Sequence, residues 1–222
     1  MDKTNSTKLH YSTVTPLLKK VLNIIMQEPL FKPFLLVGGT SLSLRMGHRK
    51  SVDIDLFTNA PYDSLDFTSF EKFFQNNFSY YYCTDTSDIV SFGRSYYIGD
   101  SEGDNIKVDM FYHDEMNDPY DIIDNIRIAS LDDVTAMKID VISRGGRKKD
   151  FWDLHELLNT YTLAEMLESH SQRYEYTHDR DQIIDNFVDF SFADKDIDPI
   201  CLKGKDWELI KLDFVEIIEE NF

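Results

Sequence analysis

The stretch that decides the fold of this chain is residues 37–57, which read VGGTSLSLRMGHRKSVDIDLF. The apolar run 34–37 leads into it and has the pattern of a short buried strand. That strand ends at Gly38-Gly39, a pair that permits a tight turn. Residues 52–57 then alternate acidic and apolar side chains, which is the period of a strand with one buried face.

Asp53 and Asp55 are the first candidate site residues. Alternate residues of a strand point to the same side, so these carboxylates share one space while Ile54 and Leu56 face the core. Neighbouring carboxylates repel unless a cation joins them, and Mg²⁺ (or Mn²⁺) takes oxygen ligands of this kind. A D-x-D pair arises often by chance among 40 acidic residues, but its place in an apolar strand favours a partnered, functional pair.

A third acid, Asp109, lies in a segment with the same alternation. Within 105–112 the apolar residues of one face alternate with Lys107, Asp109 and Phe111 on the other. Two acidic strands of this kind would flank a two-metal site. The sequence therefore predicts a metal site whose ligands are Asp53, Asp55 and Asp109.

Gly38 and Gly39 have two interpretations. A di-glycine before a helix lets the backbone approach a phosphate, with the helix N-terminus as the anion site and Thr40 and Ser41 as hydroxyl donors. The alternative is an ordinary tight turn in which Thr40 or Ser41 caps the helix. The residues alone leave both interpretations open.

The rest of the chain divides into a mixed half and a helical half. A regular alternation of strand and helix is missing, which argues against a Rossmann-type sheet. The predicted fold class is therefore α+β, with a small mixed β-sheet core backed by helices over 1–128 and a helical C-terminal domain over 129–222. The spacing predicts helices over 15–28, 41–46, 64–77, 131–143, 149–159, 163–170, 173–189 and 206–220, and strands over 34–37, 52–57, 78–84, 89–98 and 105–112.

Composition narrows the function further. The 222 residues are 42% hydrophobic, enough for a packed core, and carry 23 basic against 40 acidic residues, a net charge of −17. That sign excludes a protein that coats DNA without regard to sequence, because such binding depends on neutralising phosphates. Cys83 and Cys201 have no zinc spacing, and the chain has neither a signal peptide nor a long apolar run. We expect a soluble cytoplasmic protein without a membrane partner.

Together these residues resemble a known signature. Val37-Gly38-Gly39, thirteen residues, and Asp53-Ile54-Asp55-Leu56 resemble the first motif of DNA polymerase β-like nucleotidyltransferases, and Val108-Asp109-Met110 resembles their third carboxylate. More closely, GGTSLSLRMGHRKSVDIDLF with the later RKKDFWDLHELL is similar to the AbiEii/AbiGii-type toxin nucleotidyltransferases, over most of residues 34–160. Gly39 departs from the pattern, since many relatives have Ser there.

The resemblance implies an activity and a role for each of the three aspartates. A nucleoside monophosphate would pass from an NTP to an acceptor hydroxyl, with Mg²⁺ or Mn²⁺ as cofactor. Asp53 and Asp55 would hold the metals that bridge the triphosphate, and Asp109 would hold the second metal and help deprotonate the acceptor. The acceptor would be an RNA or tRNA end or a protein, and an antitoxin protein would be a further partner.

Several later residues are candidates for nucleotide binding. Lys138 lies near the apolar stripe of its predicted helix, so it either reaches a phosphate at the cleft wall or forms a buried ion pair. Asp150 and Asp153 favour a helix N-terminus, and the family resemblance suggests that they orient Lys138 or Arg147. Two basic clusters, either ordinary surface or nucleotide- and RNA-facing, are Arg45, His48, Arg49 and Lys50, and Arg144, Arg147, Lys148 and Lys149.

Two other functions stay open at this point. The acidic charge suits transfer to a small cationic molecule, as in related antibiotic-modifying enzymes, better than transfer to RNA. A nucleotide- or protein-binding module without turnover is the third hypothesis, although the presence of all three acids disfavours it.

Overall fold

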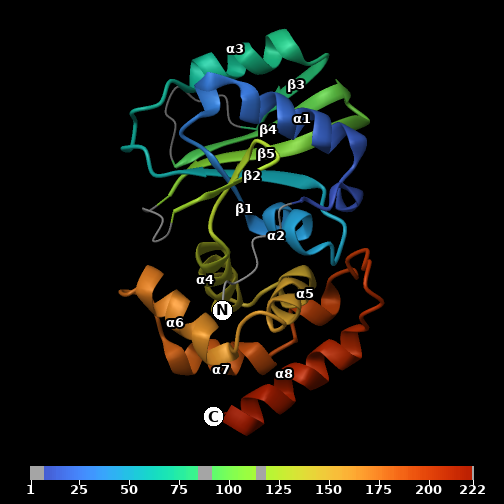
Figure 1. Cartoon of the computed structure of the whole chain (residues 1–222), viewed down its shortest axis with the longest axis vertical. Helices are drawn as coiled ribbons and strands as arrows, with labels where there is room; N and C mark the ends of the chain where they lie inside the picture. The colour runs from blue at the N-terminus through green and yellow to red at the C-terminus, as the bar shows by residue number, and fades with distance from the viewer. Residues whose placement is uncertain (1–7, 85–91, 114–118, 222) are drawn as a thin grey trace.

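The computed structural model describes residues 8–84, 92–113 and 119–221. In that part of the chain, seven strands form one mixed sheet in the order β3-β4-β5-β2-β1-β7-β6. Helices α1 and α3 cover one face of the sheet, and α2 and helices α4–α8 lie on the other side (Figure 1). The fold class predicted from the sequence is confirmed.

The elements follow one another in a simple order: in the described part of the chain, all seven strands lie before residue 129 and helices follow it. Their bounds are α1 Pro16–Gln27, β1 Leu35–Val37, α2 Gly38–Met46, β2 Asp53–Thr58, α3 Phe67–Asn77, β3 Tyr80–Cys83, β4 Gly93–Ser101, β5 Asp104–Tyr112, β6 Asp121–Ile123, β7 Ile126–Ile128, α4 Leu131–Ile142, α5 Lys148–Leu157, α6 Leu163–Arg173, α7 Arg180–Val188 and α8 Trp207–Asn221.

The central strands alternate as their sequences predict. In β2, Ile54 and Leu56 are fully buried while the aspartates face the other side, and β5 repeats the pattern with Val108 and Met110. The buried face packs against α1, which Thr15 caps through a bond from the Leu18 N–H, and against α3. The acidic face is thereby left for the side of the sheet that carries α2 and the helical half.

Helix α2 connects two hydrophobic cores. One core lies between the sheet and α1 and α3, and it includes Leu44 of α2. The other is built mainly from α4–α8, and it includes Leu42 of α2 and Val37 of β1. Because neighbouring side chains of one short helix enter both cores, α2 fixes the position of the sheet relative to the helices.

Two predictions about elements were wrong, and a third was tested only in part. Helix α2 begins at Gly38 rather than residue 41. The helix predicted over 173–189 is two elements: α6 runs on to Arg173, and α7 starts at Arg180, where the Asp179 side chain accepts a bond from Gln182 N–H. The strand predicted over 89–98 is β4 from Gly93, and its residues 89–91 lie outside the described residues.

The sequence interpretation also missed the hairpin β6–β7. Its turn residues Asp124 and Asn125 both have positive φ, 51° and 64°, a conformation that Asp and Asn tolerate better than most residues. A D-N pair between short apolar runs is therefore the signal that could have identified it. Finally, none of the described helices is long and apolar enough to cross a membrane.

Candidate functional site

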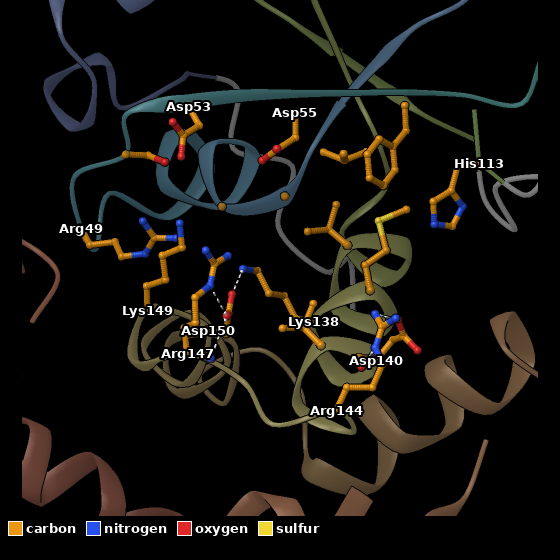
Figure 2. A pocket seen from close by; sticks show the side chains of 18 of the residues that line it. Arg49, Asp53, Asp55, His113, Lys138, Asp140, Arg144, Arg147, Lys149 and Asp150 are labelled. Atoms are coloured by element: carbon orange, nitrogen blue, oxygen red, sulfur yellow. Dashed lines mark hydrogen bonds and ion pairs between the residues drawn. The ribbon is translucent and has the colours of Figure 1, made fainter. Parts of the chain in front are cut away.

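A cavity lies between the acidic face of the sheet and helices α4–α6 (Figure 2). Its volume is about 270 Å³, near the lower end of the range of small-molecule sites. Its lining comes from segments far apart in the sequence. These residues are Val37, Gly38, Gly39, Arg49, Ser51, Asp53, Asp55, Phe57, His113, Val134, Met137, Lys138, Asp140, Val141, Arg144, Arg147, Lys149, Asp150 and Tyr174.

The two ends of this cavity differ in chemistry. Figure 2 shows Asp53 and Asp55 above Arg49, Arg147 and Lys149, and we call these five residues the charged end. His113 lies at the opposite side of the view, and its ring contacts Phe57 and Tyr174. We call Phe57, His113 and Tyr174 the aromatic end. A single cavity thus offers both fixed charge and aromatic surface to one ligand.

Asp109 lies next to the acidic pair, as predicted, but its carboxylate is already bonded. Strands β2 and β5 are parallel neighbours in which Asp55 pairs in register with Asp109. The Asp109 carboxylate accepts a hydrogen bond from Ser95 Oγ at 2.5 Å and forms an ion pair with Lys107 Nζ at 2.6 Å. It is not among the described residues that line the cavity.

The donor chemistry therefore fits a hard divalent cation at two of the three predicted ligands. Asp53 and Asp55 present carboxylate oxygens to the cavity. Asp109 could join them only by exchanging Lys107 for the metal. Consistent with this, the described residues contain no group of three or more His, Cys, Asp or Glu side chains placed to hold a metal ion.

Asp55 carries the clearest electrostatic signature of the site. Burial, together with the nearby charges of Asp109 and Asp53, raises the pKa of Asp55 from 3.8 to about 6, although Lys138 opposes the shift. A carboxylate whose charge is this unfavourable is one that gains from a bound cation.

The Gly38-Gly39 turn brings the backbone against two site residues. Gly38 has a φ of +67°, and a Cβ at this position would overlap Asp55 Oδ2. A Cβ on Gly39 would overlap Arg49 Nη2. Because α2 begins here, the N–H groups of its first turn have no partner within the helix and border the cavity. A Ser in place of Gly39 would therefore require the Arg49 guanidinium to shift.

Thr40 and Ser41 do not line the cavity. The buried Thr40 hydroxyl donates to Asp53 O and contacts Ser51 Oγ at 2.8 Å, and Ser41 Oγ donates to Gly38 O at 2.7 Å. The Thr40 bond ties the turn to β2, whereas the Ser41 bond lies within α2. The geometry favours neither a phosphate contact by these hydroxyls nor the alternative of a helix cap, since both residues lie inside α2.

A buried ion-pair network forms the floor beneath the charged end. Lys138 of α4 contacts Asp150 and Asp153 of α5, both at 2.7 Å. Asp153 also binds Arg49 through both carboxylate oxygens and His48 Nε2 at 2.7 Å. Although burial favours the neutral acid, Arg49 and Lys138 hold the pKa of Asp153 well below its usual value. Of the two interpretations of Lys138, the structure shows the buried ion pair, at a position that also lines the cavity.

The two predicted basic clusters are only partly at the site. Arg49, Arg144, Arg147 and Lys149 line the cavity, and Arg147 Nε lies 3.5 Å from Asp150. Burial and the nearby cations Arg147 and Lys138 lower the pKa of Lys149. The remaining members bond elsewhere: Arg45 to Asp121, His48 to Asp153, Lys50 to Ser12 O, and Lys148 to Asp198.

The aromatic end was missed by the sequence interpretation. Two signals could have found it, because Phe57 shares a face of β2 with Asp53 and Asp55, and His113 continues the face of β5 that carries Asp109. Tyr174 had no such signal, since it fell at the start of the helix predicted over 173–189, whereas in the structure it directly follows α6.

Comparison with known proteins identifies the family of this chain. The sequence profile of the AbiEii nucleotidyl transferase toxins, described as a type IV toxin–antitoxin system, matches residues 20–220. The chain belongs to this family. An uncharacterized protein of Aquifex aeolicus (strain VF5) is 29% identical over 154 residues, which are 64% of this chain and 66% of that protein.

Solved structures share the fold of this AbiEii family member. JHP933 from Helicobacter pylori superposes with a TM-score of 0.59 at 17% identity, covering 91% of this chain and 89% of that one. The nucleotidyltransferase toxin MenT4 from Mycobacterium tuberculosis H37Rv has a TM-score of 0.59 at 12% identity, covering 92% and 84%. At such identities the likeness establishes the architecture alone.

Replacing Gly38 tests the close approach of the turn to Asp55. Gly38→Ala adds the strain of a positive φ, about 1–2 kcal/mol, and an overlap with the Asp55 carboxylate that adds about 1–3 kcal/mol. Gly204→Ala is the matched control, because Gly204 has a φ of +69° and a Cβ added there would meet no other atom within 4 Å. Urea unfolding should show the larger loss for Gly38→Ala, and equal losses would contradict the contact.

Neutralising Asp55 should stabilise the protein at neutral pH. The folded state holds the Asp55 proton more tightly than the unfolded chain, so stability falls as pH rises from about 4 through 6. Asp55→Asn removes this penalty, which reaches about 3 kcal/mol above pH 6. Urea unfolding at pH 4.5 and 7.5 in EDTA measures it. A gain that does not grow with pH would refute the shift, and the exposed Asp104→Asn serves as control.

Removing Lys138 should destabilise the floor of the site. Lys138→Met leaves Asp150 and Asp153 buried with one cation fewer, a loss of about 3 kcal/mol. Lys148→Met is matched, since both lysine side chains are 8% exposed but Asp198, the partner of Lys148, is 67% exposed. Thermal unfolding should therefore separate the two variants, and similar midpoints would mean that the buried carboxylates do not need Lys138.

Proposed function

We propose that this AbiEii family protein transfers a nucleoside monophosphate from an NTP to an acceptor hydroxyl in the presence of Mg²⁺ or Mn²⁺, with pyrophosphate as the leaving group. The single observation that carries the proposal is the charged end of the cavity, where Asp53 and Asp55 face cationic side chains beside the Gly38-Gly39 turn. An acid pair alone would repel a triphosphate, and cations alone would bind it without activating it. Their opposition across one cavity suits metal-assisted phosphoryl chemistry.

Different residues would bind the metal and the phosphates. Asp53 and Asp55 would hold the divalent cation, which when bound neutralises charge on the triphosphate. Arg49, Arg147 and Lys149 would bind phosphate oxygens that the metal leaves exposed. The first-turn N–H groups of α2, at Gly38 and Gly39, are suited to a further phosphate oxygen.

Asp109 would act on the acceptor side of the reaction. Asp109 lies beside Asp55 on the neighbouring strand. From there its carboxylate would be a third metal ligand and would accept the proton of the attacking hydroxyl. Lys107 must then leave the Asp109 carboxylate, while Ser95 Oγ continues to orient it. Lys138 would act indirectly. Its ion pairs hold the carboxylates of Asp150 and Asp153, which in turn contact Arg147 and Arg49.

The family supports a toxin of a toxin–antitoxin system, so an antitoxin protein is the expected partner. We propose an RNA or tRNA end, or a protein hydroxyl, as acceptor, and the cytoplasm as the compartment where it meets NTPs. The net charge of −17 favours a second candidate, a small cationic acceptor, because the overall field repels RNA. The basic residues at the cavity mouth offset that field only locally.

Labelled transfer tests this function directly. The protein is incubated with each α-³²P-NTP, Mg²⁺ and either total RNA, cell protein or small cationic acceptors. Asp53→Asn should lower transfer at least a hundredfold, about 3 kcal/mol in the barrier, because it removes a metal ligand. Asp104→Asn, an exposed acid at the start of β5, should retain it.

The label distinguishes the alternatives. Product in RNA or protein supports the toxin activity, and product in the small-molecule fraction supports the second candidate. NTP binding without transfer to any acceptor would favour a binding module that keeps this fold. Wild-type activity in Asp53→Asn would contradict the mechanism.

A further inference from the structure

We propose that the aromatic end of the cavity is the nucleobase subsite, with Phe57 and His113 as its stacking wall and Arg173 as the residue that positions His113. The inference rests on the proposed function, because it takes an NTP as the ligand. It adds a direction to the bound substrate and assigns roles to three residues outside the charged end.

An NTP has an anionic end and an uncharged end, and the cavity has the three cations of the charged end at one side and aromatic rings at the other, where the ion pair of Asp140 and Arg144 also lines it. The triphosphate is anionic and suits Arg49, Arg147 and Lys149, whereas the base is planar and uncharged. Along the cavity, α4 presents Val134, Met137 and Val141, which lie at helical spacing on one face. The apolar stripe therefore leads away from the charged end.

The register of β2 fixes the distance between the two ends. Asp53, Asp55 and Phe57 lie on one face of the strand and all line the cavity. Two residues of a strand span about 6.6 Å, so the Phe57 ring begins about one sugar length beyond Asp55. A phosphate near Asp55 therefore places the ribose along β2 and the base against Phe57.

Phe57 and His113 form a preformed aromatic surface. Their ring centroids are 4.8 Å apart with an interplanar angle of 19°, which is a stacked arrangement. Tyr174 meets His113 edge-on, with centroids 6.5 Å apart at 75°. Because the two rings stack on each other, a base would stack on an outer face of the pair, and any base is accepted there because each has a π-face.

Arg173 holds His113 in one orientation. Its Nη2 lies 3.0 Å from His113 Nδ1, and its Nη1 pairs with Asp133 Oδ1 at 2.7 Å. Both side chains of this ion pair are at most 1% exposed. A guanidinium only donates hydrogen bonds, so His113 Nδ1 accepts in this contact. The buried ion pair thereby fixes the ring that stacks on Phe57.

The anchoring comes from the helical half of the protein. Asp133 lies in α4, where it also accepts a bond from the Ser130 hydroxyl, and Arg173 ends α6. His113 follows β5, and Phe57 belongs to β2. The stacking wall therefore exists only when the helices and the sheet are assembled together, which makes the proposed subsite a property of the tertiary structure.

Binding measurements on the full chain separate the base from the phosphates. Dissociation constants are measured with Mg²⁺ for the four NTPs and for inorganic tripolyphosphate, which has no base. Phe57→Ala should raise the Kd of every NTP about tenfold and leave that of tripolyphosphate within twofold. Phe111→Ala is the matched control, because Phe111 pairs in register with Phe57 on β5 but is not among the described lining residues.

Variants of His113 and Arg173 test the positioning role. His113→Ala should weaken NTP binding as Phe57→Ala does, whereas His113→Phe should retain it, because a phenyl ring still stacks. Arg173→Lys keeps a charge for Asp133 but loses the fixed fork, so NTP binding should weaken several-fold. Adding His113→Phe to Arg173→Lys should restore it, a rescue that a purely structural role of Arg173 would not give.

These outcomes separate a failure of the nucleobase subsite from a failure of the proposed transfer activity. If the wild type binds NTPs no more tightly than tripolyphosphate, or if Phe57→Ala and His113→Ala leave NTP binding unchanged, the base lies elsewhere while the proposed function stands. If the wild type binds neither NTP nor tripolyphosphate, the proposed function fails and takes this subsite with it. An equal loss for NTP and tripolyphosphate in both alanine variants also overturns the assignment.

Discussion

The structure depends on one buried carboxylate, Asp153. It joins Arg49, which precedes β2, to Lys138 of α4, and it does so where its own side chain is fully buried. A buried charge is tolerated only with close partners, so the segment before β2, helix α4 and helix α5 must meet in one arrangement. That arrangement also sets the floor of the cavity and holds the Arg49 guanidinium against Gly39.

The carboxylates above that floor lack enough positive charge around them. Asp53, Asp55 and Asp109 crowd neighbouring strands, and Lys107 and Ser95 satisfy only the last of them. The cations below are committed in part to Asp150 and Asp153. Asp55 is therefore left with an unfavourable charge, the condition in which a divalent cation gains most by binding. A neutral side chain at Asp55 would stabilise the fold, whereas binding of a cation needs the charged carboxylate.

The sequence predicted the parts of the fold that follow a local period. The alternation in 52–57 and 105–112 identified the two acidic strands, and the apolar spacing identified most helices. It failed where a loop or turn is fixed by contacts with other elements. The helix predicted over 173–189 includes residues 174–179, yet the pairing of His170 with His178 at 2.8 Å accompanies a break between α6 and α7.

By itself, then, the sequence determined which side chains share a face: Asp53 with Asp55, and Lys107 with Asp109. This follows because the strand period acts between near neighbours in the chain. Only the tertiary structure decided that Ser95 bonds to Asp109, that the Thr40 hydroxyl turns inward to Ser51 and Asp53, and that His113 stacks on Phe57. Those contacts join residues from separate elements, and their geometry depends on how the strands and helices pack together.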